Sequence, residues 1–382
     1  MNILFISHDS SRTGAPLALL SLLKSVKAKM PDVTFSVFCK ADGPLVNEFK
    51  QLCPVILPTG KPWVLPTLFT PSNLRERLSI RLLLQHIKRQ HFDLIYANSA
   101  SSLSCAVILK ERLHIPVLLH FHESSINSCY IEIHKRWIRQ CDHFIAVSAL
   151  SRDGLVELGA EPSKINIVYP TSDFIIKLLA APQTSDMQTA KDSAKTIIGF
   201  VGPLIERKGA DLLAVVMRRL STLHPDCDYE IRSVGNYLDM ERKRVEFDIQ
   251  RLDVKDRIRF LAPMEDPVPA YKEMDMLLVL SREESFSLIV PEFGLLGKTV
   301  VLFNGSCGVQ HFLKHEENAL IASYLDIDGI VEAIYQLSKD ANERHRLGEN
   351  LRKTITEHYS QYDTNSQIIN MLKEIKPSSS IS

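Results

Sequence analysis

The chain has 382 residues, of which 45% are hydrophobic and 24% charged. This length is sufficient for two domains of ordinary size, each with its own core. The composition is typical of a globular protein and indicates neither disorder nor a membrane span. The amino terminus enters an apolar run without a basic leader or a small-residue cleavage site, so we expect a cytoplasmic protein.

Basic and acidic residues balance at 45 each, but they are unevenly distributed. Residues 1–180 carry an excess of lysine and arginine, and the remainder carries an equal excess of acids. Much of the basic excess lies in residues 74–89, a leucine-containing segment that we expect to be helical. It fits an ordinary surface helix whose leucines face a sheet. It also fits an interfacial helix that holds the protein against anionic lipid, at the inner face of the membrane.

Strand-like apolar runs alternate with helix-length segments along the chain. In the first half they are Asn2–Ser7, Thr34–Cys39, Leu94–Asn98, Val117–Phe121, Phe144–Val147 and Ile165–Val168. In the second half they are Thr196–Val201, Tyr229–Ser233, Ile258–Leu261, Met276–Leu280 and Thr299–Phe303. This alternation predicts two doubly wound α/β halves, each with a parallel sheet.

The linker and the carboxyl end are predicted from composition and periodicity. Residues 181–195 lack apolar periodicity and predict a linker between domains at 1–180 and 196–355. Residues 347–373 predict a helix, and residues 377–382 predict a frayed tail.

The most informative stretch runs from Glu284 to Glu292, directly after the apolar run Met276–Leu280. The carboxyl end of a buried parallel strand opens into a crevice, where ligands bind. Pro291 has no N–H group, so a helix is predicted to begin near Val290 with Pro291 in its first turn. Backbone amides at the start of this helix would then be free to bind an anion. They are those of Ser287, Leu288 and Ile289.

Three more segments are informative together with this one: Cys141–Ser148, Phe200–Gly209 and Gly297–Val301. Together the four segments resemble the retaining glycosyltransferases of family 4, and the resemblance covers almost the whole chain. It implies the GT-B architecture, in which two Rossmann-like domains face a central cleft. The first domain would bind the acceptor and the second the nucleotide sugar. A helix beginning near residue 356 would cross back to the first domain.

The resemblance implies transfer of a hexose-type sugar from a nucleoside-diphosphate sugar to a hydroxyl of a glycan or lipid-linked acceptor. Anomeric configuration would be retained, no cofactor or metal would be required, and the product would belong to a cell-surface polysaccharide. Two alternatives stay open. One is a nucleotide-sugar epimerase of the same architecture, and the other is a noncatalytic protein that binds a sugar nucleotide or a glycan.

Each part of such a donor has a candidate partner in the second half. Lys208, with Arg207 beside it, would place positive charge on the diphosphate leaving group. By resemblance, Glu284 would contact the donor sugar near the reacting carbon, and Glu292 would accept hydrogen bonds from the ribose. The remaining donor-binding residues expected from the resemblance are Gly14, Met264, Phe286, Ser287, Leu288 and Ile289.

Plainer interpretations of these residues are also open. The segment around Lys208 could be a solvated turn. Glu284 could pair with Arg282 or Lys298 on the surface, and Glu292 could merely complement the start of its helix.

The chain departs from the family pattern at Pro203 and Ser287. The family usually has an arginine at the first position, so one phosphate contact is in doubt, and Arg207 could substitute for it. The family prefers glycine at the second position, where a serine side chain could narrow the approach to the phosphate.

Two histidines, His120 and His122, end a buried strand of the first half. The resemblance implies three catalytic residues, Lys208, Glu284 and His122. His122 would form a hydrogen bond with the donor sugar or orient the acceptor hydroxyl. His120 is expected to be a core histidine. In the first loop, Arg12 could bind an acceptor phosphate or carboxylate, or could be an exposed cation.

We expect no metal site. The seven cysteines are scattered and odd in number, without a metal-type spacing. The histidines beside Glu123 lack a second cluster at ligand spacing. The pair Asp326 and Asp328 precedes a helix and is better interpreted as a turn and a helix cap.

Overall fold

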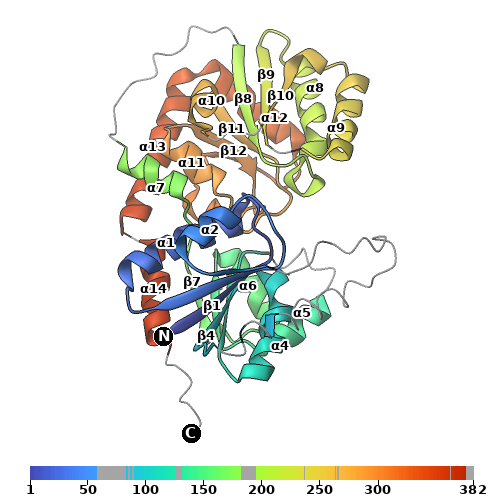
Figure 1. The fold of residues 1–382 in the computed structure, drawn as a ribbon. Helices are drawn as coiled ribbons and strands as arrows, with labels where there is room; N and C mark the ends of the chain where they lie inside the picture. The colour runs from blue at the N-terminus through green and yellow to red at the C-terminus, as the bar shows by residue number, and fades with distance from the viewer. Residues whose placement is uncertain are drawn as a thin grey trace. The chain divides into compact units, whose positions relative to one another are not determined.

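The computed structural model describes residues 1–57, 83–84, 87, 90–124, 131–181, 195–235, 237–262, 264, 266–361 and 363–375. It divides into two compact units, Met1–Asp173 with Asp363–Ser382, and Phe174–Tyr362 (Figure 1). The predicted linker lies outside the described residues except at its two ends. The segment 74–89 also lies largely outside them, but Leu83 and Ile87 are buried in the core of the first unit.

The first unit contains a seven-stranded parallel sheet with the order β3-β2-β1-β4-β5-β6-β7. Its strands are β1 Asn2–Ser7, β2 Thr34–Cys39, β3 Val55–Ile56, β4 Leu94–Asn98, β5 Val117–Phe121, β6 His143–Ala146 and β7 Ile165–Ile167. Its described helices before residue 173 are α1 Gly14–Lys29, α2 Val46–Leu52, α4 Leu103–Leu113, α5 Ile131–Ile138 and α6 Ala149–Glu157, with 3-10 helices η1 Ala100–Ser102 and η3 Pro162–Lys164.

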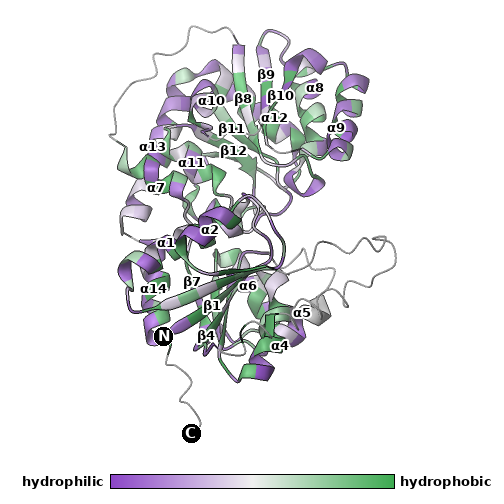
Figure 2. Cartoon of the chain, viewed as in Figure 1, coloured by the Kyte–Doolittle hydropathy of each residue, from purple (hydrophilic) through white to green (hydrophobic). Residues whose placement is uncertain are grey.

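Both faces of this sheet are buried, as continuous apolar strands require. Along β1, Ile3 and Phe5 face a cluster that includes leucines of α1, whereas Leu4 and Ile6 face a cluster that includes α4. This alternation follows the two-residue period of a strand. Figure 2 shows the hydrophobic residues concentrated on the strands and the hydrophilic ones on helices such as α9.

The second unit contains a six-stranded parallel sheet with the order β10-β9-β8-β11-β12-β13. Its strands are β8 Lys195–Val201, β9 Asp228–Val234, β10 Ile258–Leu261, β11 Met276–Val279, β12 Thr299–Phe303 and β13 Leu320–Ala322. Its helices are α7 Asp173–Ala180, α8 Leu213–Leu223, α9 Asp239–Arg251, α10 Val268–Glu273, α11 Ile289–Leu295, α12 Ile327–Lys339 and α13 Ala341–Gln361, with 3-10 helices η4 Glu206–Lys208, η5 Ala210–Leu212, η6 Lys255–Arg257 and η7 Gly308–Phe312.

The doubly wound class is confirmed, and each predicted strand is present. In each sheet the strand order reverses beside the first strand of the unit, between β1 and β4 in one and between β8 and β11 in the other. In open α/β sheets, ligands bind outside the carboxyl ends of the strands at such a reversal. The segments that follow β8 and β11 are therefore the candidates for a ligand site in the second unit.

The prediction of one continuous helix over 347–373 is wrong. Two helices occupy this region, α13 and α14 Thr364–Glu374. The break is stabilised by Asp363, the N-cap of α14, whose side chain accepts a hydrogen bond from the Ser366 amide at 3.1 Å. The chain thus returns to the first unit at Asp363, and α7 belongs to the second unit, whereas the predicted domain boundaries were 356 and 180.

Candidate active site

Two glycines place the lysine that follows β8. Gly202 has φ of +138°, and a Cβ atom on it would lie 4.0 Å from Cε of Lys208. Gly209 has φ of +74°, and a Cβ atom there would lie only 2.1 Å from the carbonyl oxygen of Leu280. Only glycine allows both this left-handed conformation and this approach. The η4 turn therefore packs closely against the end of β11.

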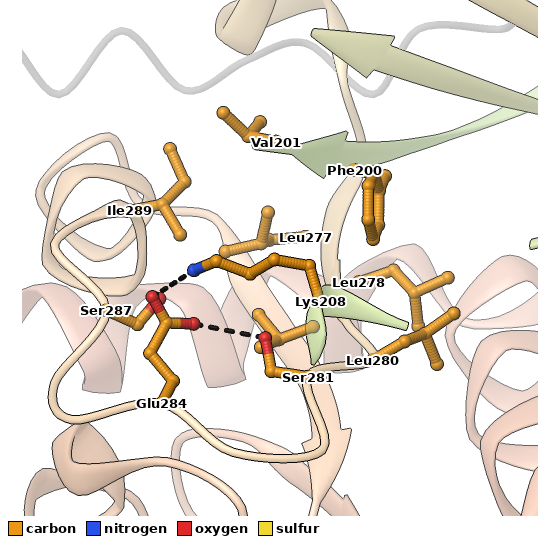
Figure 3. A pocket seen from close by; sticks show the side chains of 11 residues that line it. Phe200, Val201, Lys208, Leu277, Leu278, Leu280, Ser281, Glu284, Ser287 and Ile289 are labelled. Atoms are coloured by element: carbon orange, nitrogen blue, oxygen red, sulfur yellow. Dashed lines mark hydrogen bonds and ion pairs between the residues drawn. The ribbon is translucent and has the colours of Figure 1, made fainter. Parts of the chain in front are cut away.

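Lys208 forms an ion pair with Glu284 (Figure 3). The other carboxylate oxygen of Glu284 accepts a hydrogen bond from Ser281 Oγ at 3.1 Å. Its backbone is held from both sides, because the Glu284 amide donates to Ser306 and the Gly308 amide donates to the Glu284 carbonyl. Burial disfavours the charged carboxylate, but Lys208, with smaller effects of Arg207 and Ser281, outweighs it and lowers the pKa of Glu284 below its usual range.

These side chains line a pocket at the carboxyl ends of β8 and β11, with about 240 Å³ of empty space that includes its open mouth. In Figure 3, Lys208 and Glu284 point toward one another beside Ser287 and Ile289. The lining residues are Phe200, Val201, Lys208, Leu277, Leu278, Val279, Leu280, Ser281, Glu284, Ser287 and Ile289. Sequence reasoning missed Ser281, because a serine after a strand carries no signal of its own.

The two loops of the pocket are joined by reciprocal contacts around Arg282. Its guanidinium binds both carboxylate oxygens of Asp211, at 2.8 and 2.7 Å, and donates to the Glu206 carbonyl at 2.5 Å. Arg207 in turn donates from its side chain to the Glu283 carbonyl at 3.1 Å. The proposed alternative pairing of Glu284 with Arg282 is therefore wrong, because Arg282 is bound to Asp211.

The start of α11 agrees with the prediction to within one residue, and it explains the family preference for glycine at position 287. Ser287 has φ of +79°, a left-handed conformation that costs a residue with a side chain roughly 1 kcal/mol. Its hydroxyl is buried and lies beside the buried thiol of Cys307. The amides of Leu288 and Ile289 follow it at the helix start. Phe286 instead has its ring in the core.

Glu292 lies in the first turn of α11. Burial raises the pKa of its carboxyl to about 8. Its charge also raises the pKa of the nearby Tyr271 and Tyr359, after the larger effect of their own burial. Within the described residues the Glu292 carboxyl has neither an ion pair nor a hydrogen-bond partner. Met264, in the loop after β10, is 39% exposed.

In the first unit, the histidines lie at the carboxyl end of β5. His122 Nε2 lies 3.1 Å from Oδ1 of Asn98, and its ring centre lies 4.0 Å from that of His120. Burial, with His8 nearby, lowers the pKa of His122 to about 3. His120 is a core residue as predicted: its Nδ1 lies 2.7 Å from Tyr96 Oη, although its Nε2 has no partner among the described residues.

Glu123 supports the loop that carries His122. Its carboxyl accepts hydrogen bonds from the amides of Ala100, at 2.9 Å, and of His122, at 3.0 Å. Burial raises its pKa to about 7 against the opposing effect of these amides. In the described ranges, no group of three or more His, Cys, Asp or Glu side chains is placed to hold a metal ion. Asp326 is the N-cap of α12, as predicted.

In the first loop, the two residues expected to bind substrate are Gly14 and Arg12. Gly14 begins α1, and a Cβ atom on it would meet nothing within 4 Å. Arg12 is 59% exposed and forms an ion pair with Glu48 at 2.6 Å. Among the helices that the structure describes, none is long and apolar enough to cross a membrane.

Comparisons with known proteins agree with this architecture. Residues 183–354 match the family model described as glycosyl transferases group 1, and residues 30–173 match glycosyltransferase family 4. D-inositol 3-phosphate glycosyltransferase from Corynebacterium kroppenstedtii is 26% identical over 59% of this chain. That alignment spans 51% of the relative, so the chain matches about half of the relative's length.

Solved structures match over nearly the whole chain. Anabaena Alr3699/HepE in complex with UDP-glucose is 20% identical, with a TM-score of 0.80 and coverage of 98% of this chain and 100% of that one. Sucrose-phosphate synthase from Thermosynechococcus elongatus is 18% identical, with a TM-score of 0.81 and coverage of 98% and 99%. The two family models together span most of the chain, and the chain belongs to the family 4 glycosyltransferases, with the GT-B fold.

Proposed function

We propose that this protein transfers a hexose-type sugar from a nucleoside-diphosphate sugar to a hydroxyl of a glycan or lipid-linked acceptor, with retention of anomeric configuration. The observation that carries the proposal is the partly buried ion pair of Lys208 with Glu284 at the strand-order reversal of the second sheet. A cation held there can meet a diphosphate, and a carboxylate beside it can bind sugar hydroxyls.

Donor binding would exchange partners within this pair. In the free protein each charge compensates the other, so neither is left buried alone. A bound diphosphate would take Lys208, and the donor sugar hydroxyls would take Glu284. The amides at the start of α11 and the side chain of Arg207 would add donors to the phosphate oxygens, and Glu292 would accept from the ribose hydroxyls. These roles follow the family pattern and the side chains around the pocket.

The reaction then needs no covalent nucleophile from the protein. The bond between the anomeric carbon and the diphosphate oxygen breaks, and its electron pair leaves with the diphosphate. The acceptor oxygen forms the new bond from the same face, and its proton passes to the departing diphosphate oxygen. Lys208 stabilises the charge that develops there, so we propose that no metal ion takes part. His122 would bond a sugar hydroxyl during this step.

We also propose where the protein acts in the cell and what kind of product it helps to make. A role in cell-surface polysaccharide synthesis would place the protein in the cytoplasm, in peripheral contact with anionic membrane. The segment 74–89 that would make this contact lies largely outside the described residues. Buried Leu83 and Ile87 favour the interpretation that its apolar side chains face the sheet.

A ligand panel tests the donor assignment. Melting temperatures are measured with UDP, GDP, ADP and CMP and with their common sugar conjugates, for the wild type and for Glu292→Ala. A ligand at about a hundred times its Kd stabilises the protein by about 2.7 kcal/mol. UDP is the first candidate because the Anabaena structure contains UDP-glucose. Stabilisation by one nucleotide that disappears in the variant is expected. Stabilisation by none of them would overturn the proposal.

Product analysis with the donor that binds completes this test. Release of the nucleoside diphosphate that depends on an added acceptor supports transfer. Conversion of the donor to an isomer without any acceptor would instead identify an epimerase.

A further inference from the structure

We infer that Asn98 fixes the hydrogen position on His122, so that the imidazole offers a lone pair at Nδ1 and accepts, rather than donates, a hydrogen bond at the sugar hydroxyl. This assignment of a positioning residue rests on the proposed function for its purpose. The geometry behind it belongs to the first unit alone.

The side-chain amide of Asn98 contacts a backbone carbonyl. Asn98 is the last residue of β4 and is fully buried. Its Nδ2 lies 3.0 Å from the carbonyl oxygen of Ala15. A carbonyl oxygen only accepts hydrogen bonds, so the amide end that faces it must be the NH₂ group. The orientation of the Asn98 amide therefore follows from its contacts, which is the ground on which such orientations are assigned.

The opposite end of the same amide then determines the ring. With its NH₂ group on Ala15, Asn98 presents Oδ1 to Nε2 of His122, at 3.1 Å. An amide oxygen also only accepts, so Nε2 must carry the hydrogen. In a neutral imidazole the other nitrogen, Nδ1, then holds the lone pair. Within the described part of the chain, no residue bonds to Nδ1.

The surroundings keep the ring neutral. His122 lies beside His120 and is partly buried. Its burial and the nearby His8 both oppose a second proton on the ring. The carboxyl of Glu123 is directed to the amides of Ala100 and His122, and no hydrogen bond joins it to the ring among the described residues. A neutral ring with one defined tautomer is a hydrogen-bond acceptor toward any hydroxyl that reaches Nδ1.

The same amide also ties His122 to the first loop. Ala15 lies in the first turn of α1, next to Gly14. Both the loop and the histidine are expected to meet substrate, and Asn98 holds a backbone atom of one and a ring atom of the other. A change in the loop would therefore reach the ring through a single side chain.

The test measures imidazole nitrogen shifts by ¹⁵N NMR on the full-length protein without ligand, with His122→Gln to identify the resonances. We expect a protonated Nε2 and an unprotonated Nδ1 in the wild type, and a mixture of tautomers in Asn98→Ala. Tyr96→Phe is the matched control, because it removes the hydroxyl partner of His120 and should leave the His122 signals unchanged. A protonated Nδ1 in the wild type, or unchanged His122 signals in Asn98→Ala, would overturn the inference.

Activity adds a readout that a merely structural role would not produce. Asn98→Ala should lower kcat/KM roughly tenfold, the size of one hydrogen bond, while nucleotide binding stays the same. In Asn98→Asp the carboxylate should stabilise the imidazolium and raise the pKa of the ring, so the ring takes up a proton from solvent and activity should rise with pH as the imidazolium loses it. A flat profile in that variant would contradict the assignment. Absence of transfer by the wild type would sink the proposed function but would leave the NMR result standing.

Discussion

Glu284 and Glu292 show how the surroundings of a carboxyl determine its charge. Both are partly buried, yet the pKa of Glu284 is lowered, chiefly by Lys208, and that of Glu292 is raised by burial to about 8. At neutral pH the first is therefore ionised and the second is mostly protonated. A pair of acids whose pKa values are driven apart is typical of sites in which the two have different tasks.

This difference predicts proton release when nucleotide binds. Ribose hydroxyls donate hydrogen bonds more strongly to a carboxylate than to a neutral acid, so binding favours the ionised form of Glu292. Below the free-protein pKa of about 8, each binding event should expel a proton. Affinity should therefore rise with pH up to about 8 and level off above it.

Calorimetric titrations at pH 7 in two buffers of different ionisation enthalpy measure this proton directly. The observed heat should differ between the buffers for the wild type and should not differ for Glu292→Gln. Equal heats for the wild type would show that Glu292 does not change charge on binding.

Substitutions at Lys208 and Glu284 should separate stability from activity. Lys208→Met leaves a buried carboxylate without its partner and should destabilise the protein by about 3 kcal/mol. The double variant Lys208→Met with Glu284→Gln removes both charges and should recover most of that loss. If Lys208 meets the diphosphate as proposed, both variants lack that cation and should lose transfer activity by at least roughly a hundredfold.

Chemical denaturation and a transfer assay on the same preparations test this pair. Transfer at the wild-type rate by a well-folded double variant would refute the role of Lys208. A double variant as unstable as the single one would show that the ion pair is not what Lys208 contributes to stability.

At the scale of elements, the strands were predictable because buried parallel strands are continuous apolar runs. β3 and β13, of two and three residues, were missed. β7 is as short as β13 but was predicted, because its apolar run continues to Val168. The break at Asp363 was missed because apolar side chains recur on both sides of it. Aspartate is also common on the polar faces of helices, so this residue did not mark a helix start by itself. A helix end can be predicted from the sequence only where the helical recurrence of apolar residues changes, and here it continued across the break.

The candidate site was predictable only in part. Its charged residues were found through the order of four segments, but their partners were not. Arg282 and Asp211 are 71 residues apart, and Asn98 lies far in sequence from both Ala15 and His122. Such contacts depend on which strands become neighbours and on how the loops after them are placed. A residue-by-residue pattern carries no record of that placement.

The Arg282 contacts predict a measurable role for an element boundary. Asp211, in the first turn of η5, anchors the guanidinium that binds the Glu206 carbonyl next to the lysine turn. Asp211→Asn should loosen this turn and reduce kcat about tenfold. The ion pair is partly exposed, so the melting temperature should change little.

Asp328→Asn is the matched control. Asp328 also lies in the first turn of its helix and also binds a forked arginine, Arg219, on the same unit. It has no contact with the pocket, so its substitution should leave kcat unchanged. Equal activity of the two variants would show that the Arg282 contacts do not position Lys208.

At the scale of the whole molecule, the chain leaves the first unit after Asp173 and returns to it at Asp363. The returning helix α14 completes the first core, because Ile368, Ile369 and Leu372 pack in the same cluster as the leucines of α1. Asn365 adds a hydrogen bond to Ser25 Oγ at 2.9 Å. The first unit is thus built from both ends of the sequence and depends on its last helix.

Leu372→Ala should therefore destabilise the first unit selectively. The side chain is fully buried, so its truncation should cost about 2–5 kcal/mol and lower the melting temperature of that unit by roughly 5–15 °C. Both tryptophans of the chain, Trp63 and Trp137, lie in sequence within residues 1–173. Trp137 packs against the core of the first unit, so its fluorescence during heating follows that unit, while nucleotide binding is used to report on the second.

Leu337→Ala is the matched substitution in the second unit, because Leu337 is equally buried in the core of that unit. The first variant should shift the fluorescence transition and keep its affinity for nucleotide at 25 °C, whereas the second should weaken nucleotide binding with a smaller effect on fluorescence. If both substitutions moved the fluorescence transition equally, the two units would unfold as one cooperative body. In that case α14 would be stabilising the whole chain and not the first unit alone.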